Sequence, residues 1–206
     1  MADEMVFVVD DDADVRDSLC ALLESAGVAS ESYDSARAFL DVYQPQRSGC
    51  LIADIRMPDM DGLELQEELN RRNAALPVIV VTGHADVPLA VRAMKAGAVD
   101  LIEKPYDDAL LLASVRRALA KAQSVREQAA TAEAAKARIA NLSARERQVL
   151  ELLVAGQPNK IIAYELDISP RTVEIHRAHV MEKMEAKSLS DLVRAAIAAG
   201  IPGASK

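Results

Sequence analysis

Short apolar runs alternate with helix-like segments over roughly the first 120 residues of the chain. The apolar runs are typical of strands, and between them apolar residues recur every three or four positions, as in amphipathic helices. Strands are expected at residues 5–9, 28–32, 49–53, 77–81 and 99–102. The first, third and fourth are almost wholly apolar, which is typical of strands covered on both faces. The pattern predicts a doubly wound α/β domain with a five-stranded parallel sheet in flavodoxin-like order 2-1-3-4-5.

The stretch from about 108 to 138 keeps a helical composition but gradually loses its large apolar residues. It contains neither Gly nor Pro, and it is rich in Ala, Glu, Gln, Lys and Arg. This composition favours a semi-rigid helical spacer over the alternative, a disordered linker. A coiled coil is disfavoured because no heptad of large apolar residues is sustained.

The last part of the chain is predicted to be a small all-α domain of four short helices. Ser143 and Glu146 have the spacing of a capping box, and Ser169 followed by Pro170 is a strong helix start. Helices at 158–166 and 170–183 are separated by a short turn and form a helix-turn-helix candidate. The expected divisions are a first domain at 4–121, a helical linker at 122–138 and a second domain at 139–203.

Charge is divided unevenly along the 206 residues, whose net charge is −8. Residues 1–120 carry a net −11, whereas residues 121–140 carry +2 and residues 141–206 carry +1. If the chain has a nucleic-acid partner, the C-terminal end is where the charge does not oppose it, although a dedicated DNA-binding domain is often far more basic. The two cysteines, far apart and within apolar segments, argue against a disulfide or zinc framework. No apolar run approaches the ~18 residues of a membrane helix, so we expect a soluble, cytoplasmic protein without a membrane partner.

Polar side chains follow four of the predicted strands. Asp10, Asp11 and Asp12 follow the first strand, and Asp54 follows the third. Thr82 follows the fourth strand, and Lys104 lies just after the fifth. Because the carboxyl ends of parallel strands meet at one edge of a sheet, these residues are expected to form a single site.

The chemistry of these residues fits a divalent cation and a phosphoryl group. If Asp10, Asp11 and Asp54 lie 4 to 5 Å apart, each like-charge pair costs about 3 to 4 kcal/mol at an effective dielectric constant near 20. The cluster must then bind a proton or a cation, and Mg²⁺ suits an all-oxygen site open to water and phosphate. Asp54 can act as a nucleophile on phosphorus, while Thr82 and Lys104 contact the phosphoryl oxygens.

A simpler interpretation treats each motif separately. The three consecutive aspartates would then only cap the following helix, and Thr82 would only begin a loop. The combined interpretation is favoured because four such motifs stand in the correct order and Pro105 follows Lys104.

Residues 4–121 resemble the receiver domain of response regulators. The motifs that carry the resemblance are Asp10 to Asp12, Asp54 to Pro58 with Gly62, Thr82 with Gly83, and Lys104 with Pro105. The resemblance implies that Asp54 accepts a phosphoryl group from a sensor histidine kinase. It also implies that Asp11 and the Arg56 carbonyl bind Mg²⁺, with Asp10 as an outer acidic partner, and that the peptide before Pro105 is cis. Leu101 stands where many receivers carry a switch aromatic, so the usual coupling of Thr82 to an aromatic rotation is in doubt.

Residues 139–203 resemble the LuxR-type helix-turn-helix domain. The resemblance rests on residues 142–150, Gly156, Asn159, Lys160, residues 169–173, His176 and Lys183. Helical spacing places Val173, Val180 and Met184 in the core. The helix from residue 170 is long enough to enter a major groove. Five other residues of this helix are expected to face solvent or DNA: Arg171, Thr172, Glu174, Ile175 and Ala178.

Individual DNA contacts follow from the chemistry of these side chains. Glu174 can accept from a cytosine amino group, and Ile175 and Ala178 can touch thymine methyls. Phosphate contacts are expected from Lys160, Arg177 and Lys187. A metal site at His176 and His179 is disfavoured, since no nearby carboxylate or Cys supports it.

As a whole, the chain resembles the response regulators of nitrogen fixation. This implies a transcription activator that an oxygen-sensing haem kinase phosphorylates, and that dimerises and binds double-stranded promoter DNA, where RNA polymerase is a further expected partner. Phosphorylation is expected to repack the region from Thr82 to Leu101 into a dimer surface. The apolar stripe of the last helix, from Leu189 to Ile197, is either core or part of a dimer face.

Two other functions compete with this interpretation. A Mg²⁺-dependent phosphatase is disfavoured because the nucleophile follows the third strand, not the first, and no cap insertion builds a substrate pocket. A phosphorylation-independent DNA-binding protein is disfavoured because no residue of the phosphoryl site is missing. We expect no enzyme activity beyond slow hydrolysis of the protein's own aspartyl phosphate.

Overall fold

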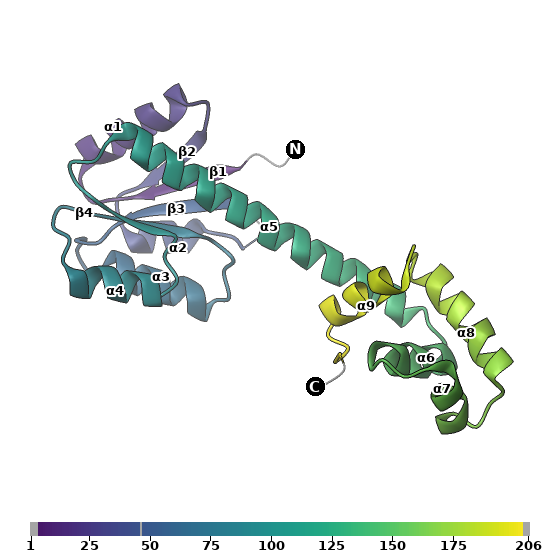
Figure 1. Ribbon diagram of the computed structural model, residues 1–206. Coiled ribbons are helices and arrows are strands. Elements are labelled where there is room, and N and C mark those ends of the chain that lie inside the picture. Colours follow the sequence, from purple (N-terminus) through teal and green to yellow (C-terminus); the bar gives the residue numbers. More distant parts are fainter. Residues whose placement is uncertain (1–3, 46, 204–206) are drawn as a thin grey trace. The chain divides into compact units, whose positions relative to one another are not determined.

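The computed structural model describes residues 4–45 and 47–203. The chain forms two compact units, which divide after Arg126. The division lies within one long helix, α5 (Asp108–Ala140), so this helix belongs partly to each unit. The helical spacer expected from the sequence is therefore present (Figure 1).

The first unit is built on a sheet of five parallel strands in the predicted order β2-β1-β3-β4-β5. The strands are β1 (Met5–Val9), β2 (Ala29–Tyr33), β3 (Gly49–Asp54), β4 (Val78–Thr82) and β5 (Asp100–Glu103). Four of the five differ from the predicted bounds by one residue at one or both ends. In β2 the cause is that Val28 still closes the preceding helix, since its N–H donates to the carbonyl of Leu23 at 2.9 Å.

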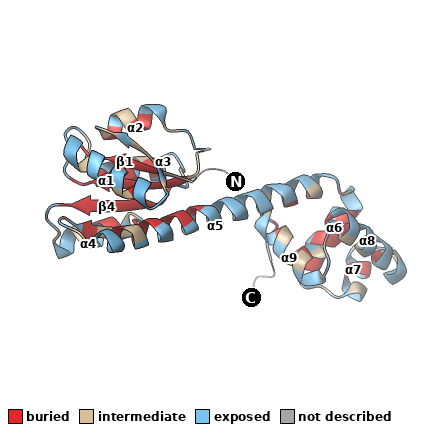
Figure 2. Cartoon of the chain, turned by 90° about the horizontal axis from the view of Figure 1, so that it is seen from above, coloured by how far each residue is buried: buried red, intermediate tan, exposed pale blue. Residues whose placement is uncertain are grey.

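Helices cover both faces of this sheet. On one face lie α1 (Ala13–Ser25) and the first part of α5. On the other lie α2 (Ala36–Val42), α3 (Gly62–Arg71) and α4 (Val87–Lys95). Because successive side chains of a strand point to opposite faces, each strand contributes to two cores. In β1, Val6 and Val8 pack against α1 and α5, whereas Phe7 and Val9 pack towards α2 and α3. The central strands β1, β3 and β4 are almost wholly buried, whereas the edge strand β2 is not; Figure 2 shows β1 and β4 in the colour of buried residues.

The register of the strands fixes where the predicted site residues emerge. Val9 lies beside Ala53, so that Asp10 leaves β1 next to Asp54 at the end of β3. Thr82 pairs with Glu103, the residue before Lys104. Asp10, Asp54, Thr82 and Lys104 are thus brought to the same edge of the sheet.

The second unit is entirely helical in its described residues. Its helices after α5 are α6 (Ala144–Val154), α7 (Asn159–Glu165), α8 (Pro170–Lys183) and α9 (Leu189–Ala198). Val173, Val180 and Met184 are buried in its core, as predicted, together with Leu150 and Leu192. In the turn between α7 and α8, Asp167 takes a positive φ of 52°. No helix in the described residues is both long and apolar enough to cross a membrane.

A buried carboxylate ties two helices of this unit together. Glu146 closes the capping box of α6: it accepts from the Ser143 N–H at 2.8 Å, and its own N–H donates to the Ser143 hydroxyl at 3.3 Å. Lys183, in the last turn of α8, donates to the same carboxylate at 2.7 Å. The Lys183 hydrogen bond, followed by those from Ser143, lowers the pKa of Glu146 to about 2. The neighbouring His179 Nδ1 lies 3.6 Å away.

The ion pair of Glu146 with Lys183 should make the free energy of unfolding of the helical unit fall in acid. Because the pKa of Glu146 is lower in the folded protein, its ion pair stabilises fully above about pH 4.5 and is lost as the pH falls towards 2. We expect Glu146→Gln to destabilise this unit by about 1 kcal/mol at neutral pH and to flatten that acid dependence. Calorimetric unfolding of the full chain at several pH values tests this. Glu151→Gln, which removes a partner of Arg147 at the exposed surface, should change neither.

Candidate phosphoryl-acceptor site and helix-turn-helix

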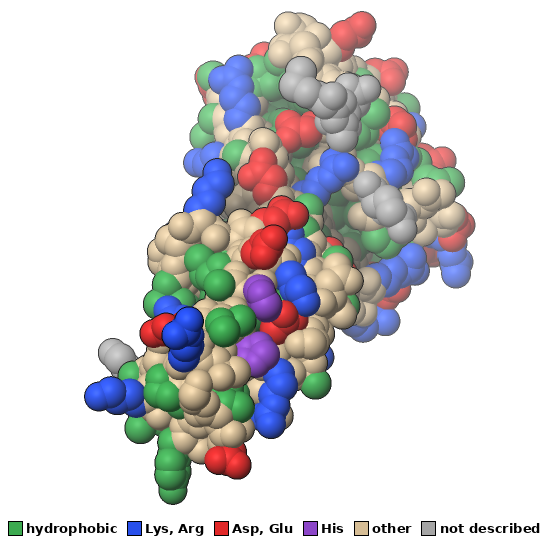
Figure 3. Space-filling model, turned by 90° about the vertical axis from the view of Figure 1, so that its right-hand side faces the viewer, with side chains coloured by type: hydrophobic (Ala, Val, Ile, Leu, Met, Phe, Trp, Pro, Cys, Tyr) green, Lys and Arg blue, Asp and Glu red, His purple; other side chains and the backbone are tan. Residues whose placement is uncertain are grey.

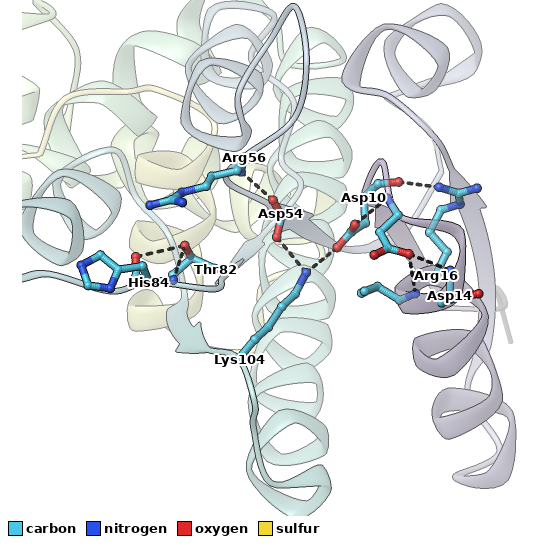
Figure 4. A network of polar contacts seen from close by, with 10 residues as sticks. Asp10, Asp14, Arg16, Asp54, Arg56, Thr82, His84 and Lys104 are labelled. Carbon is cyan, nitrogen blue, oxygen red and sulfur yellow. Dashed lines mark hydrogen bonds and ion pairs between the residues drawn. The ribbon is translucent and has the colours of Figure 1, made fainter.

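One lysine joins two buried carboxylates at the carboxyl edge of the sheet (Figure 4). Lys104 Nζ donates to Asp10 Oδ2 at 2.7 Å and to Asp54 Oδ1 at 2.8 Å. The three side chains come from the ends of β1, β3 and β5, and the carboxylates are only 4% and 8% exposed. The predicted convergence of Asp10, Asp54 and Lys104 is therefore what the structure shows.

The electrostatics of this trio leave a net negative charge at the site. Partial burial by itself lowers the pKa of Lys104, but hydrogen bonds to Asp10 and Asp54 and their charges together raise that pKa above its ordinary value. The lysine is therefore a fixed cation at neutral pH. It offsets one of the two carboxylate charges, and the other remains available to a cation.

The backbone around Asp54 is held closely. The Arg56 N–H donates to Asp54 Oδ2 at 2.5 Å, so each carboxylate oxygen of Asp54 has a donor. Behind this strand end, Gly62 begins α3, and its N–H donates to the Ile55 carbonyl at 3.2 Å. A β-carbon at Gly62 would lie 2.3 Å from the Asp54 carbonyl oxygen. Only glycine allows α3 to start this close to the site.

The three aspartates after β1 separate in the structure. Asp12 caps α1 by accepting from the Asp14 N–H at 2.9 Å, as the simpler interpretation expected of this residue. Asp11 is exposed, and no three His, Cys, Asp or Glu side chains of the described residues form a ready metal-ligand set. The expected cluster of three carboxylates is replaced by a pair bridged by Lys104. The ammonium group of Lys104 reduces the repulsion between the carboxylates of Asp10 and Asp54. A third carboxylate beside them would have increased that repulsion.

The donors that do converge fit a magnesium ion. Mg²⁺ is commonly held by one or two carboxylates together with water and phosphate oxygens, rather than by a full protein cage. Asp10 and Asp54 supply two hard oxygen donors with one uncompensated charge between them.

Thr82 is fully buried, and its hydroxyl is bonded within its own loop. It donates to the His84 carbonyl at 3.2 Å and accepts from the His84 N–H at 3.3 Å. The following Ala85 N–H donates to the Glu103 carboxylate at 3.0 Å. Leu101, at the predicted switch position, is partly buried and packs against the core that contains α2, α3 and α4.

Most of the residues predicted to face DNA are exposed. These are Lys160, Arg171, Glu174, Ile175, Ala178 and Lys187. Thr172 instead pairs with the Ser169 hydroxyl at 2.8 Å at the start of α8. Arg177 is half-buried and donates to Asn159 on α7. On the side shown in Figure 3, basic, acidic, histidine and apolar side chains are interspersed rather than gathered into one basic patch.

The contacts of three residues at these sites were not predicted from the sequence, although Asn159 was noted as part of the LuxR-type resemblance. Arg16 donates to the Asp10 carbonyl, Glu103 holds the loop after Thr82, and Asn159 anchors Arg177. All three lie close in sequence to motif residues, which is only a weak indication of a role at these sites. Each acts through a main-chain group or a single side-chain pair, which no residue pattern specifies.

Comparison with known proteins places both units in established families. Residues 6–116 match the response regulator receiver domain, and residues 140–196 match the luxR family of bacterial regulatory proteins. The chain therefore belongs to the response regulators with a LuxR-type DNA-binding domain. A receiver implies a histidine kinase as partner, and receivers generally use Mg²⁺ for phosphorylation.

Within this class, the chain is similar to FixJ over almost its full length. It is 57% identical over 197 residues to the transcriptional regulatory protein FixJ of Azorhizobium caulinodans, covering 95% of this chain and 93% of that protein. It is 52% identical over 200 residues to FixJ of Rhizobium meliloti, covering 97% of this chain and 98% of that protein.

Two solved structures are similar to the chain over nearly its full length. The crystal structure of full-length FixJ from B. japonicum matches with a TM-score of 0.58 at 50% identity, covering 98% of this chain and 100% of that chain. The response regulator StyR matches with a TM-score of 0.79 at 41% identity, covering 95% and 99%. The chain is thus a FixJ-like transcription regulator.

The close approach of α3 to Asp54 generates a stability prediction. Gly62→Ala should destabilise the first unit by about 1 to 3 kcal/mol, because the methyl group would overlap the Asp54 carbonyl. Denaturant unfolding measures this change. Gly83→Ala is the matched control at the same edge of the sheet, since a β-carbon there meets no atom within 4 Å. Equal stabilities of the two variants would contradict the prediction.

Proposed function

We propose that Asp54 accepts a phosphoryl group from a sensor histidine kinase of the oxygen-sensing haem type, FixL, and that the phosphorylated protein activates transcription. The single observation that carries this proposal is the lysine shared by two buried carboxylates at the edge of the sheet. The FixJ relatives support the regulatory role and favour genes of nitrogen fixation. We place the phosphoryl chemistry in residues 4–121, the linker at 122–138 and DNA binding in residues 139–203, in a cytoplasmic protein.

In the transfer, a carboxylate oxygen of Asp54 bonds to phosphorus as the bond from phosphorus to the donor histidine breaks. Lys104 Nζ lies 2.8 Å from Asp54 Oδ1. It would therefore be close enough to stabilise the negative charge of the phosphoryl oxygens during transfer. Mg²⁺, when bound, would neutralise part of that charge, and Asp10, Asp11, Asp54 and the Arg56 carbonyl would hold it. The same site would hydrolyse the aspartyl phosphate slowly.

The Thr82 hydroxyl is the proposed link between phosphorylation and the rest of the molecule. It cannot donate both to the His84 carbonyl, as it does here, and to a phosphoryl oxygen on Asp54. Phosphorylation therefore favours a second arrangement of this loop, with repacking of Leu101. We propose that this arrangement forms a dimer surface, so that two helix-turn-helix domains can engage promoter DNA and RNA polymerase together.

In the DNA complex, α8 would enter the major groove. Glu174, Ile175 and Ala178 would face base edges, and Lys160, Arg171 and Lys187, which are exposed, would contact phosphates. Thr172 and Arg177 remain candidates for contact, although each already has a partner within the domain.

The acceptor assignment predicts that Asp54→Asn abolishes labelling by radioactive acetyl phosphate in the presence of Mg²⁺. The amide cannot form the acyl phosphate. Asp59→Asn is the matched control: Asp59 is exposed in the next loop at φ 65°, a conformation that Asn tolerates, and labelling should stay at the parent level. Labelling is read by gel, and dimer formation by light scattering.

Other outcomes of this experiment favour the competing functions. Labelling of Asp54→Asn at the parent level would reject the acceptor assignment. Rapid turnover of a small phosphate ester by the parent would favour a phosphatase. Equal promoter affinity of the phosphorylated and unphosphorylated parent would favour phosphorylation-independent DNA binding.

The proposed DNA contacts predict two different kinds of defect. Lys160→Ala should weaken binding to all duplexes about equally and reduce the salt dependence by roughly one counterion. Glu174→Ala should instead relax the preference at one base pair, at a cost of about 1 to 3 kcal/mol. Fluorescence anisotropy with a promoter duplex and its single-base variants, at several salt concentrations, separates the two. Lys136→Ala, on the exposed part of α5, is the control and should change neither.

A further inference from the structure

Asp10 is held through all four of its polar groups. Its N–H donates to the Tyr33 carbonyl at 3.3 Å, and Oδ1 accepts from the Asp12 N–H at 3.0 Å. Oδ2 accepts from Lys104, as described above. The fourth group, its main-chain carbonyl, accepts from Arg16 Nη1 at 2.8 Å (Figure 4). Three of these partners belong to the backbone or to the phosphoryl site, whereas Arg16 has no role in the chemistry proposed so far.

Arg16 lies in α1 and reaches back over the turn that leads from β1 into this helix. Residues 10–17 contain five aspartates and a single basic residue, Arg16. Its side chain is half-buried and ends on a main-chain oxygen rather than on any of these carboxylates. The guanidinium thus holds the position of the backbone at the end of β1.

The loss of this bond would act directly on the metal-binding end of the site. Asp10 is only 2% exposed, so its carbonyl cannot turn to water without moving the turn. An unsatisfied buried acceptor costs more than an ordinary hydrogen bond contributes, and the turn would therefore rotate to satisfy it. Such a rotation would move the carboxylate of Asp10 away from Lys104 and Asp54.

We propose that Arg16 is a positioning residue that holds the turn after β1 in the geometry needed to bind a divalent cation. The inference rests on the proposed function, because it assumes that Asp10 and Asp54 contribute to the cation site. Residues outside the ligand set that orient the ligands typically change metal affinity by 10- to 100-fold when they are replaced. We expect an effect near the lower end of this range, since one of the four bonds of Asp10 is lost.

The sign of the effect separates positioning from simple electrostatics. Removal of a positive charge beside a cluster of carboxylates should strengthen cation binding if charge alone matters. Loss of the hydrogen bond from Arg16 to the Asp10 carbonyl should instead weaken cation binding.

The test uses the full-length unphosphorylated protein, with Mn²⁺ as the probe and electron paramagnetic resonance to measure free Mn²⁺. Arg16→Ala removes both the charge and the donor while favouring the helix. Arg16→Gln removes the charge but keeps an N–H donor. Arg116→Ala, at an exposed position of α5, removes the same charge elsewhere. We expect the Kd for Mn²⁺ to rise about tenfold in Arg16→Ala. It should stay within about threefold of the parent in Arg16→Gln and be unchanged in Arg116→Ala.

A second readout follows labelling by acetyl phosphate as Mg²⁺ is increased. The labelling rate of Arg16→Ala should recover at saturating Mg²⁺, because the defect lies in cation affinity. A Kd for Arg16→Ala equal to or below that of the parent would overturn the proposal. Unfolding of Arg16→Ala together with parent-like melting of Arg16→Gln would overturn it too, since the bond would then serve the fold alone.

The parent protein distinguishes failure of this inference from failure of the proposed function. If acetyl phosphate labels Asp54 but the parent binds no Mn²⁺, Arg16 has no cation site to position, and the acceptor assignment stands. If the parent is neither labelled nor bound by Mn²⁺, the proposed function falls with the inference.

Discussion

The ion pairs of Lys104 with Asp10 and Asp54 are the interaction on which the site depends. Two carboxylates that are almost fully buried cannot remain charged side by side without compensation, because their repulsion is strong in a low-dielectric setting. A single ammonium group meets this need with two short hydrogen bonds. The compensation is incomplete by one formal charge, which is the electrostatic basis for the cation proposed at this site.

The sheet is what brings these three side chains together. They stand 44 and 50 residues apart along the chain, yet the parallel register carries each to the same edge. Two apolar cores, one on each face, fix that register, since a shift of one residue would turn the side chains of a strand towards the wrong helices. The relative positions of the site residues therefore depend on the packing of residues such as Phe7 and Val8, which take no part in the chemistry of the site.

The parts that could be predicted from sequence are those set by pattern. Apolar runs located the strands, and the polar residue after each run located Asp10, Asp54 and Lys104. Pattern could not show how neighbouring aspartates divide their tasks. In the structure Asp12 caps its helix and Asp11 is exposed, whereas Asp10 pairs with Lys104. Likewise, the exposed face of α8 followed from helical spacing, whereas the pairing of Arg177 with Asn159 depends on how α7 packs, which is a property of the tertiary structure.

The exposure of the middle of α5 affects how the sequences of proteins with this architecture can diverge. Residues 123–131 are all exposed, and Figure 2 shows the corresponding exposed stretch in the middle of α5. Neither hydrophobic core therefore constrains the volume of their side chains. Selection on this stretch can act on helix propensity and solubility but hardly on shape. Most exchanges among good helix formers should then be nearly neutral here, while glycine or proline would be filtered out. The linker can thus drift freely in identity while its backbone conformation is retained.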